Sequence, residues 1–122
     1  MVALLPEGKA KIQAAQKDKI AKLKHVKAFL RSLDKKTIIY HERIVRMGEK
    51  KLLETGAVDR FDVQTIFNYV NLERMFSNIK NGNSRKKVMS VYGKIYMYLK
   101  KHNEIDSEWE FPKEKDLPGI EP

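Results

Sequence analysis

The sequence predicts an all-α protein, a bundle of four to five helices with a long N-terminal helix and an irregular C-terminal arm. Apolar residues recur three and four positions apart through most of the chain, which is the spacing of a helix with one buried face. No stretch of useful length alternates apolar and polar residues, as half-buried strands do. With 122 residues, of which 42% are hydrophobic, the chain fits a single folded domain.

We divide the chain into a basic N-terminal helix extension (residues 1–22), a helical domain (23–103) and an acidic, proline-containing C-terminal arm or linker (104–122). The first helix is expected from Glu7 to about Leu33. Its first half is rich in lysine and alanine, so we expect it to project as a solvated extension or to lie along a partner. Its second half has apolar residues spaced three and four apart and is expected to pack on the core.

A second helix is expected from about Lys36 to Thr55, after a break in the apolar pattern at residues 32–34. Gly56 is a suitable residue to end it. The apolar residues of this helix cover nearly two faces, which predicts that other helices pack on both sides of it.

The rest of the helical domain is expected to contain one helical stretch from Val63 and a last helix from Ser84. Asp62 is a good N-cap for a helix that begins at Val63. The apolar stripe changes phase near Asn71, which predicts either a kink or two short helices there. The last helix, Ser84–His102, follows an Asn-Gly-Asn turn, and we expect Ser84 to be its N-cap.

The C-terminal arm contains Pro112, Pro118 and Gly119, which argue against regular structure. Trp109 and Phe111 are large apolar side chains in acidic surroundings. Either Trp109 packs back on the domain, or the two aromatic residues bind a second copy of the chain or another protein.

Charge is distributed unevenly along the chain. The formal net charge is +9, yet the residues from Glu104 onward include seven acidic and two basic residues, which leaves +14 on residues 1–103. A basic body with an acidic tail is typical of a protein that binds a polyanion, most often a nucleic acid. The alternative is a solvated, lysine-rich surface that serves solubility.

Several classes of function lack the residues that they need. The chain has no cysteine, and His25, His41 and His102 do not have the spacing of a metal site. No glycine-rich phosphate loop and no paired carboxylates are evident, so we expect no enzyme activity from this chain alone, no cofactor and no metal. No apolar run reaches the length of a membrane span, and no secretory signal is recognised. We expect an intracellular protein, cytoplasmic or located with DNA, without a membrane partner.

Basic residues gather at the starts of two predicted helices. Arg85, Lys86 and Lys87 follow Ser84, in a first turn where the helix dipole favours anions. A second basic group, residues 35–43, lies on or near the start of the second helix. Both positions would suit an anionic partner.

The order of these elements resembles the core-binding domain of tyrosine recombinases and phage-type integrases, a SAM-like helical bundle. The resemblance is carried by Thr37-Ile38-Ile39-Tyr40 within KKTIIYHERIVRMGEKKLLETG, by FDVQTIFNYV, by NGNSRKKVMSVYGKIYMYLKKHNEID, and by Pro112 and Pro118 in the exit segment. It covers roughly residues 29–118. It implies a module that forms half of a DNA clamp and lays two helices near the major groove, either within a longer recombinase or as a stand-alone protein.

The resemblance also implies a set of DNA-binding residues at the two basic helix starts. These are Lys35, Lys36, Thr37, Arg43, Asn83, Ser84, Arg85, Lys86, Lys87 and Lys94. Helix N-termini and basic side chains would hold phosphates, and tyrosine hydroxyls on the last helix would add to them. With about five phosphates neutralised, the logarithm of affinity should fall with the logarithm of salt concentration at a slope of roughly −4 to −5. No catalytic residue of the recombinases is carried over.

Two other functions stay open on the sequence. The chain fits a protein-interaction module that uses the lysine-rich first helix or the Trp109 arm. It also fits a nucleoprotein that coats nucleic acid without sequence preference. Substituting Trp109→Ala separates the first of these from DNA binding, because only a protein contact would be lost.

Overall fold

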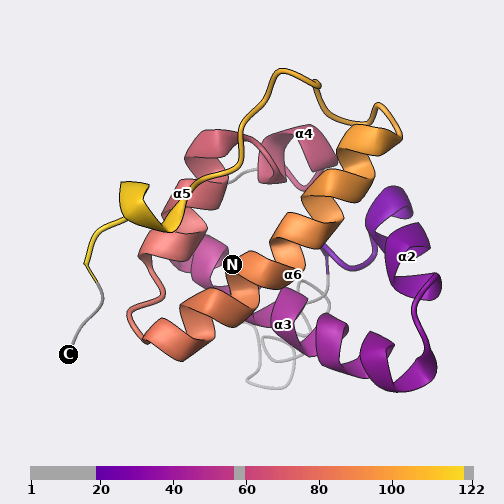
Figure 1. Cartoon of the computed structure of the whole chain (residues 1–122), viewed down its shortest axis with the longest axis horizontal. Coiled ribbons are helices and arrows are strands. Elements are labelled where there is room, and N and C mark those ends of the chain that lie inside the picture. Colours follow the sequence, from indigo (N-terminus) through magenta and orange to yellow (C-terminus); the bar gives the residue numbers. More distant parts are fainter. Residues whose placement is uncertain (1–18, 57–59, 120–122) are drawn as a thin grey trace, which may run out of the picture.

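The computed structural model describes residues 19–56 and 60–119, which form five α-helices, one 3-10 turn and no strand (Figure 1). The all-α prediction is confirmed. The elements are α2 (Lys24–Arg31), α3 (Lys35–Glu54), α4 (Val63–Ile66), α5 (Tyr69–Ser77), α6 (Gly82–Lys101) and η1 (Glu114–Asp116).

The two long helices, α3 and α6, cross at the centre of the molecule (Figure 1). A glycine permits the close crossing: a Cβ atom on Gly48 would lie 2.5 Å from Cε2 of Tyr92 and 2.8 Å from Sδ of Met75. The Tyr92 hydroxyl then donates a 2.7 Å hydrogen bond to the carbonyl of Val45, one turn before Gly48. Tyr92 is fully buried, so this bond joins the two helices inside the core.

Aromatic rings fill the space around the crossing. Phe67 and Phe76 pack on Tyr92 with ring centroids 5.7 and 6.3 Å away, and Phe111 from the C-terminal arm packs on Phe76 and Tyr96. The arm is therefore part of the core, and Trp109 packs back on the domain as one of the two alternatives predicted. Apart from η1, the arm is irregular, as its prolines and glycine suggest.

The N-terminal region departs from the predicted long helix. Residues 19–23 form turns, and the helix begins only at Lys24. Ile20 is fully buried, and its backbone N–H donates a 2.7 Å hydrogen bond to the carboxylate of Glu49, which is buried on α3. This contact anchors the chain before α2. The predicted projecting half of the first helix lies almost wholly outside the described residues.

Side-chain caps define the other helix starts. Asp34 and Asp62 each accept a hydrogen bond from the backbone N–H three residues later, and Asp62 was predicted to do so. α3 agrees with its predicted bounds within one residue, and Gly56 ends it with a φ of +65°. The predicted break near Asn71 is present as two short helices, but it falls earlier because Asn68 caps α5.

Because Tyr92 and Tyr96 are buried, the free energy of unfolding should decrease at alkaline pH. Burial raises the pKa of Tyr92 well above its usual range, with a further contribution from Glu49. Burial followed by the charges of Glu110 and Asp106 raises the pKa of Tyr96. Below about pH 10, tyrosines are protonated in both the folded and the unfolded chain. Above it, the unfolded chain ionises while these two hydroxyls stay protonated, so the free energy of unfolding should fall as pH rises.

Chemical denaturation at a series of pH values, with the absorbance of tyrosinate followed in parallel, checks this. Tyr92→Phe is the matched control: it loses the bond to the Val45 carbonyl, worth about 1 kcal/mol, but should show a shallower alkaline loss. Ionisation of all tyrosines together near pH 10 in a protein that stays folded would contradict the expectation.

Candidate nucleic-acid interface

One face of α6 is basic and exposed along its whole length. We call it the α6 basic face; its polar members are Asn83, Lys86, Lys87, Ser90, Lys94 and Lys101, and the exposed side chain of Met97 lies among them. It lies opposite the face that buries Val88, Tyr92 and Ile95. α6 contains no aspartate and no glutamate in its 20 residues, so no carboxylate on the helix offsets these lysines.

The spacing of the lysines gives this face a regular charge pattern. Lys87, Lys94 and Lys101 are seven residues apart, which at 1.5 Å per residue separates them by about 10 Å along the helix axis. Within residues 19–56 and 60–119, none of the ion pairs found involves them. The charges are therefore available to a partner.

Arg85 does not belong to this face, which corrects its predicted role. Its side chain is 1% exposed, with Nε donating to the carbonyl of Ile79 (3.0 Å) and Nη1 to the carbonyl of Pro118 (2.7 Å). The reason is helical phase, because Arg85 precedes Val88 and Tyr92 by three and seven residues and so points into the core. Arg85 fastens the C-terminal arm and does not reach the surface.

Ser84 is not the N-cap of α6. The helix starts two residues earlier, and the side chain of Asn81 accepts a 3.0 Å hydrogen bond from the Ser84 backbone N–H. The first turn therefore holds Gly82, Asn83 and Ser84, which are uncharged, and the basic residues fall in the second turn. The predicted mismatch between three cations and the first turn is wrong, although Lys86 and Lys87 remain exposed.

The second predicted group lies on α3. Lys35, Lys36 and Arg43 are exposed, and the Arg43 guanidinium lies 6.0 Å from the ring centroid of Tyr40. Thr37 is half-buried, and its backbone N–H is occupied by the Asp34 cap. Cations beside an exposed aromatic ring form a second polar surface, separate from α6.

The structure does not bring the two groups into one patch. α3 and α6 pack through their inner faces, as the contact between Gly48 and Tyr92 shows, so their outer faces point away from each other. In Figure 1, α3 begins at the lower right and α6 at the lower left, with α6 in front. A partner seated on the α6 basic face is thus turned away from the outer face of α3.

The tyrosines of α6 have little part in a phosphate-binding surface. Tyr92 and Tyr96 are buried, so the expected contacts of their hydroxyls with phosphates are wrong. Tyr98 is half-buried, with its ring against Phe29 and His102. All three rings therefore serve the packing of α6 first.

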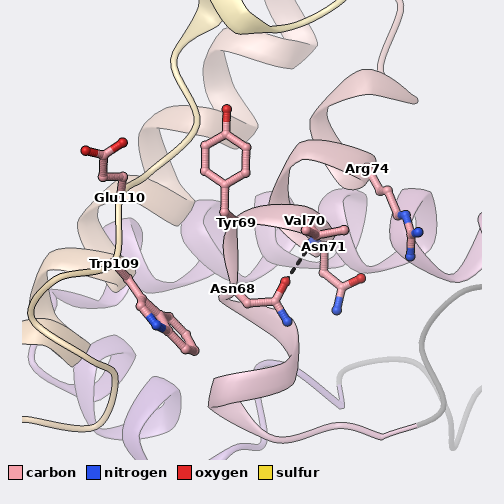
Figure 2. Close-up of a pocket in the computed structure, with 7 residues that line it drawn as sticks. All are labelled: Asn68, Tyr69, Val70, Asn71, Arg74, Trp109 and Glu110. Carbon is pink, nitrogen blue, oxygen red and sulfur yellow. Dashed lines mark hydrogen bonds between the residues drawn. The ribbon is translucent and has the colours of Figure 1, made fainter.

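A hollow that sequence reasoning missed lies between α5 and the C-terminal arm (Figure 2). Its volume is about 590 Å³, and its lining residues are Asn68, Tyr69, Val70, Asn71, Arg74, Trp109 and Glu110. The Asn68 side chain accepts from the Asn71 backbone N–H and donates to the carbonyl of Thr65, which fixes one wall. The hollow forms because the C-terminal arm folds back against α5. The only indication of it in the sequence is Trp109, an aromatic residue in the arm.

Other chemistry finds no support in the part of the chain described. No group of three or more histidine, aspartate or glutamate side chains there could hold a metal ion. No helix among the described residues has the length and apolar character needed to cross a membrane. The three histidines have other contacts: His25 Nε2 lies 3.0 Å from Glu104 Oε2, His41 Nδ1 lies 2.9 Å from the carbonyl of Thr37, and the His102 ring packs on Tyr98.

Comparisons with protein-family models, with curated proteins and with solved structures find no match to this chain. The likeness to the core-binding domain of tyrosine recombinases rests on the sequence pattern. What the α6 basic face binds is therefore inferred from the charge, exposure and geometry of its residues.

Proposed function

We propose that the protein is a DNA-binding helical module that holds duplex DNA through the α6 basic face. The observation that carries this proposal is the exposure of Lys86, Lys87, Lys94 and Lys101 on one face of a helix without a carboxylate. Phosphate contacts by lysine supply affinity without reading sequence. The resemblance implies a role as the core-binding domain of a recombinase or integrase; of the two basic groups that it places on DNA, only the one on α6 belongs to this surface.

The size and polarity of the face support this partner. A helix of 20 residues is about 30 Å long, close to one turn of a DNA duplex. Asn83 and Ser90 lie between the lysines and add neutral hydrogen-bonding groups, and asparagine can pair with the edge of adenine. The carboxylates of the arm repel phosphates, which directs DNA toward α6 and away from the arm.

A salt titration tests the proposal. If the four lysines each neutralise one phosphate, the logarithm of affinity for a labelled duplex should fall with the logarithm of salt concentration at a slope of roughly −3 to −4. Lys87→Ala and Lys94→Ala should each reduce that slope by about one. The matched control is Lys50→Ala, an exposed lysine on α3, which should leave the slope unchanged.

Fluorescence anisotropy at several salt concentrations measures these slopes. A response that is flat in salt, or no binding at low salt, would remove the proposal. Equal affinity for unrelated duplexes would identify binding without sequence preference, and a preferred sequence would favour the recombinase-like module.

A further inference from the structure

The lining of the hollow in Figure 2 includes apolar and aromatic side chains beside four polar ones, and the described chain leaves it open. Tyr69, Val70 and Trp109 line it, and Val70 is 55% exposed. A second hollow shares Trp109 and Asn68 with it and extends toward α4. Trp109 packs on the core, yet it still presents surface to both hollows. A side chain of moderate size therefore finds room here.

Carboxylates gather at the end of this hollow near the C-terminal arm, and we call it the acidic hollow. Glu110 belongs to its lining. Burial, and then the charges of Asp116, Glu73 and Glu110, raise the pKa of the Tyr69 hydroxyl, so three carboxylates lie near that ring. Arg74 is the cation of the lining, and Figure 2 shows it at the end away from Glu110. The end near the arm therefore favours a cationic partner.

The outer face of α3 has the opposite character. Ile39 is 71% exposed and Tyr40 is 40% exposed, and Lys36 and Arg43 flank them one turn away on either side. The Arg43 guanidinium rests near the Tyr40 ring, which keeps cation and aromatic ring together. We call these four residues the α3 stripe.

We propose that the α3 stripe of one copy docks in the acidic hollow of a second copy. Ile39 and Tyr40 would meet Val70 and Trp109, while the flanking cations would lie beside the carboxylates at the arm. Two arguments favour a second copy as the occupant. The charges of the two surfaces are complementary, and three of the five large hydrophobic side chains exposed in the described residues (Ile39, Tyr40 and Val70) lie in them.

The contact is head-to-tail, because the two surfaces differ and lie on different sides of the molecule. α3 begins at the lower right of Figure 1, whereas α5 and the arm lie at the upper left. A heterologous contact of this kind repeats, because each copy that joins an assembly still has one unoccupied surface to which a further copy can bind. The α6 basic face takes no part, and the inference goes beyond DNA binding without depending on it.

Sedimentation velocity without DNA, at low salt and over a range of protein concentrations, tests the contact. The wild-type chain should show a weight-average mass that rises above 14.3 kDa with concentration and falls back as salt screens the charges. Ile39→Glu disables the α3 stripe, and Val70→Lys disables the acidic hollow; both positions are exposed, so the fold should persist. Met97→Glu, 64% exposed and outside both surfaces, is the matched control and should associate as the wild type does.

The decisive sample is a mixture of the two disabled variants. Each alone should stay monomeric, but together they retain one intact stripe and one intact hollow, so they should form a dimer of twice the chain mass and nothing larger. A wild-type chain that stays monomeric up to about millimolar concentration overturns the proposal, since weak interfaces still associate there. So does a mixture that stays monomeric, or variants that associate like the wild type. Loss of DNA binding would leave this assay unaffected.

Discussion

Gly48→Ala should destabilise the protein by about 3 kcal/mol, a large fraction of the 5–15 kcal/mol that holds a typical domain. The new methyl group would lie 2.5 Å from Cε2 and 2.8 Å from Cζ of Tyr92, so either the ring or the whole of α6 must move. Movement of the ring also breaks its hydrogen bond to the Val45 carbonyl, worth about 1 kcal/mol. The better helix propensity of alanine, about 1 kcal/mol, recovers only part of this loss.

Gly93→Ala is the matched control on the other side of the crossing. Its Cβ would lie 3.7 Å from the ring of Phe111, an ordinary contact, so helix propensity should dominate and the variant should be as stable as the wild type or up to about 1 kcal/mol more stable. Urea denaturation followed by circular dichroism gives both values. Equal stabilities of the two variants would contradict the close crossing of α3 and α6.

Arg85→Ala is expected to lower the free energy of unfolding by about 3 kcal/mol, through loss of two charge-assisted hydrogen bonds and of buried packing. Arg85→Met keeps much of the volume and removes a buried charge, so its cost should be smaller. The Nη2 atom supports this order, because it is buried without a hydrogen-bond partner among the described residues. Both variants should free the segment around Pro118 from α6, while Phe111 still holds the rest of the arm.

Measurements of DNA binding should distinguish the role of Arg85 from that of its neighbour Lys86. The folded Arg85→Met protein should keep the wild-type salt slope, because the guanidinium does not reach the surface. Lys86→Ala should do the reverse: its stability should change by less than about 0.5 kcal/mol while the slope falls by about one. Denaturation and anisotropy on the same two variants measure both effects. A smaller salt slope for folded Arg85→Met than for the wild type would show that Arg85 contacts DNA.

Local signals in the sequence were sufficient for most of the helices. The bounds of α3, the Asp62 cap and the stop at Gly56 follow from apolar spacing and capping preferences within a few residues of each position. The start of α6 does not follow from local signals, because Asn81 and Ser84 are both good caps and propensity alone does not choose between them. The turns at residues 19–23 include a hydrogen bond to Glu49, 29 residues away from Ile20, and local patterns do not contain such a contact.

The candidate site shows a similar division. The exposed lysines of α6 follow from charge and helical phase, and the same phase would have placed Arg85 inward beside Val88 and Tyr92. Gly48 also carried a readable signal, since it shares the inner face with Val45 and Leu52 and so marks a close approach. The acidic hollow could not be predicted from the sequence, because it forms only where the arm meets α5.

The hydrogen bond between Tyr92 and Val45 also has a kinetic consequence. It joins residues 47 positions apart, and the bond from Arg85 to Pro118 spans another 33. Closing such long loops costs entropy before any contact forms, so a fold with these pairings should fold more slowly than a helical bundle built from local contacts. During synthesis, α3 must wait for α6 to leave the ribosome, and the part of its inner face that Tyr92 covers stays exposed in that interval.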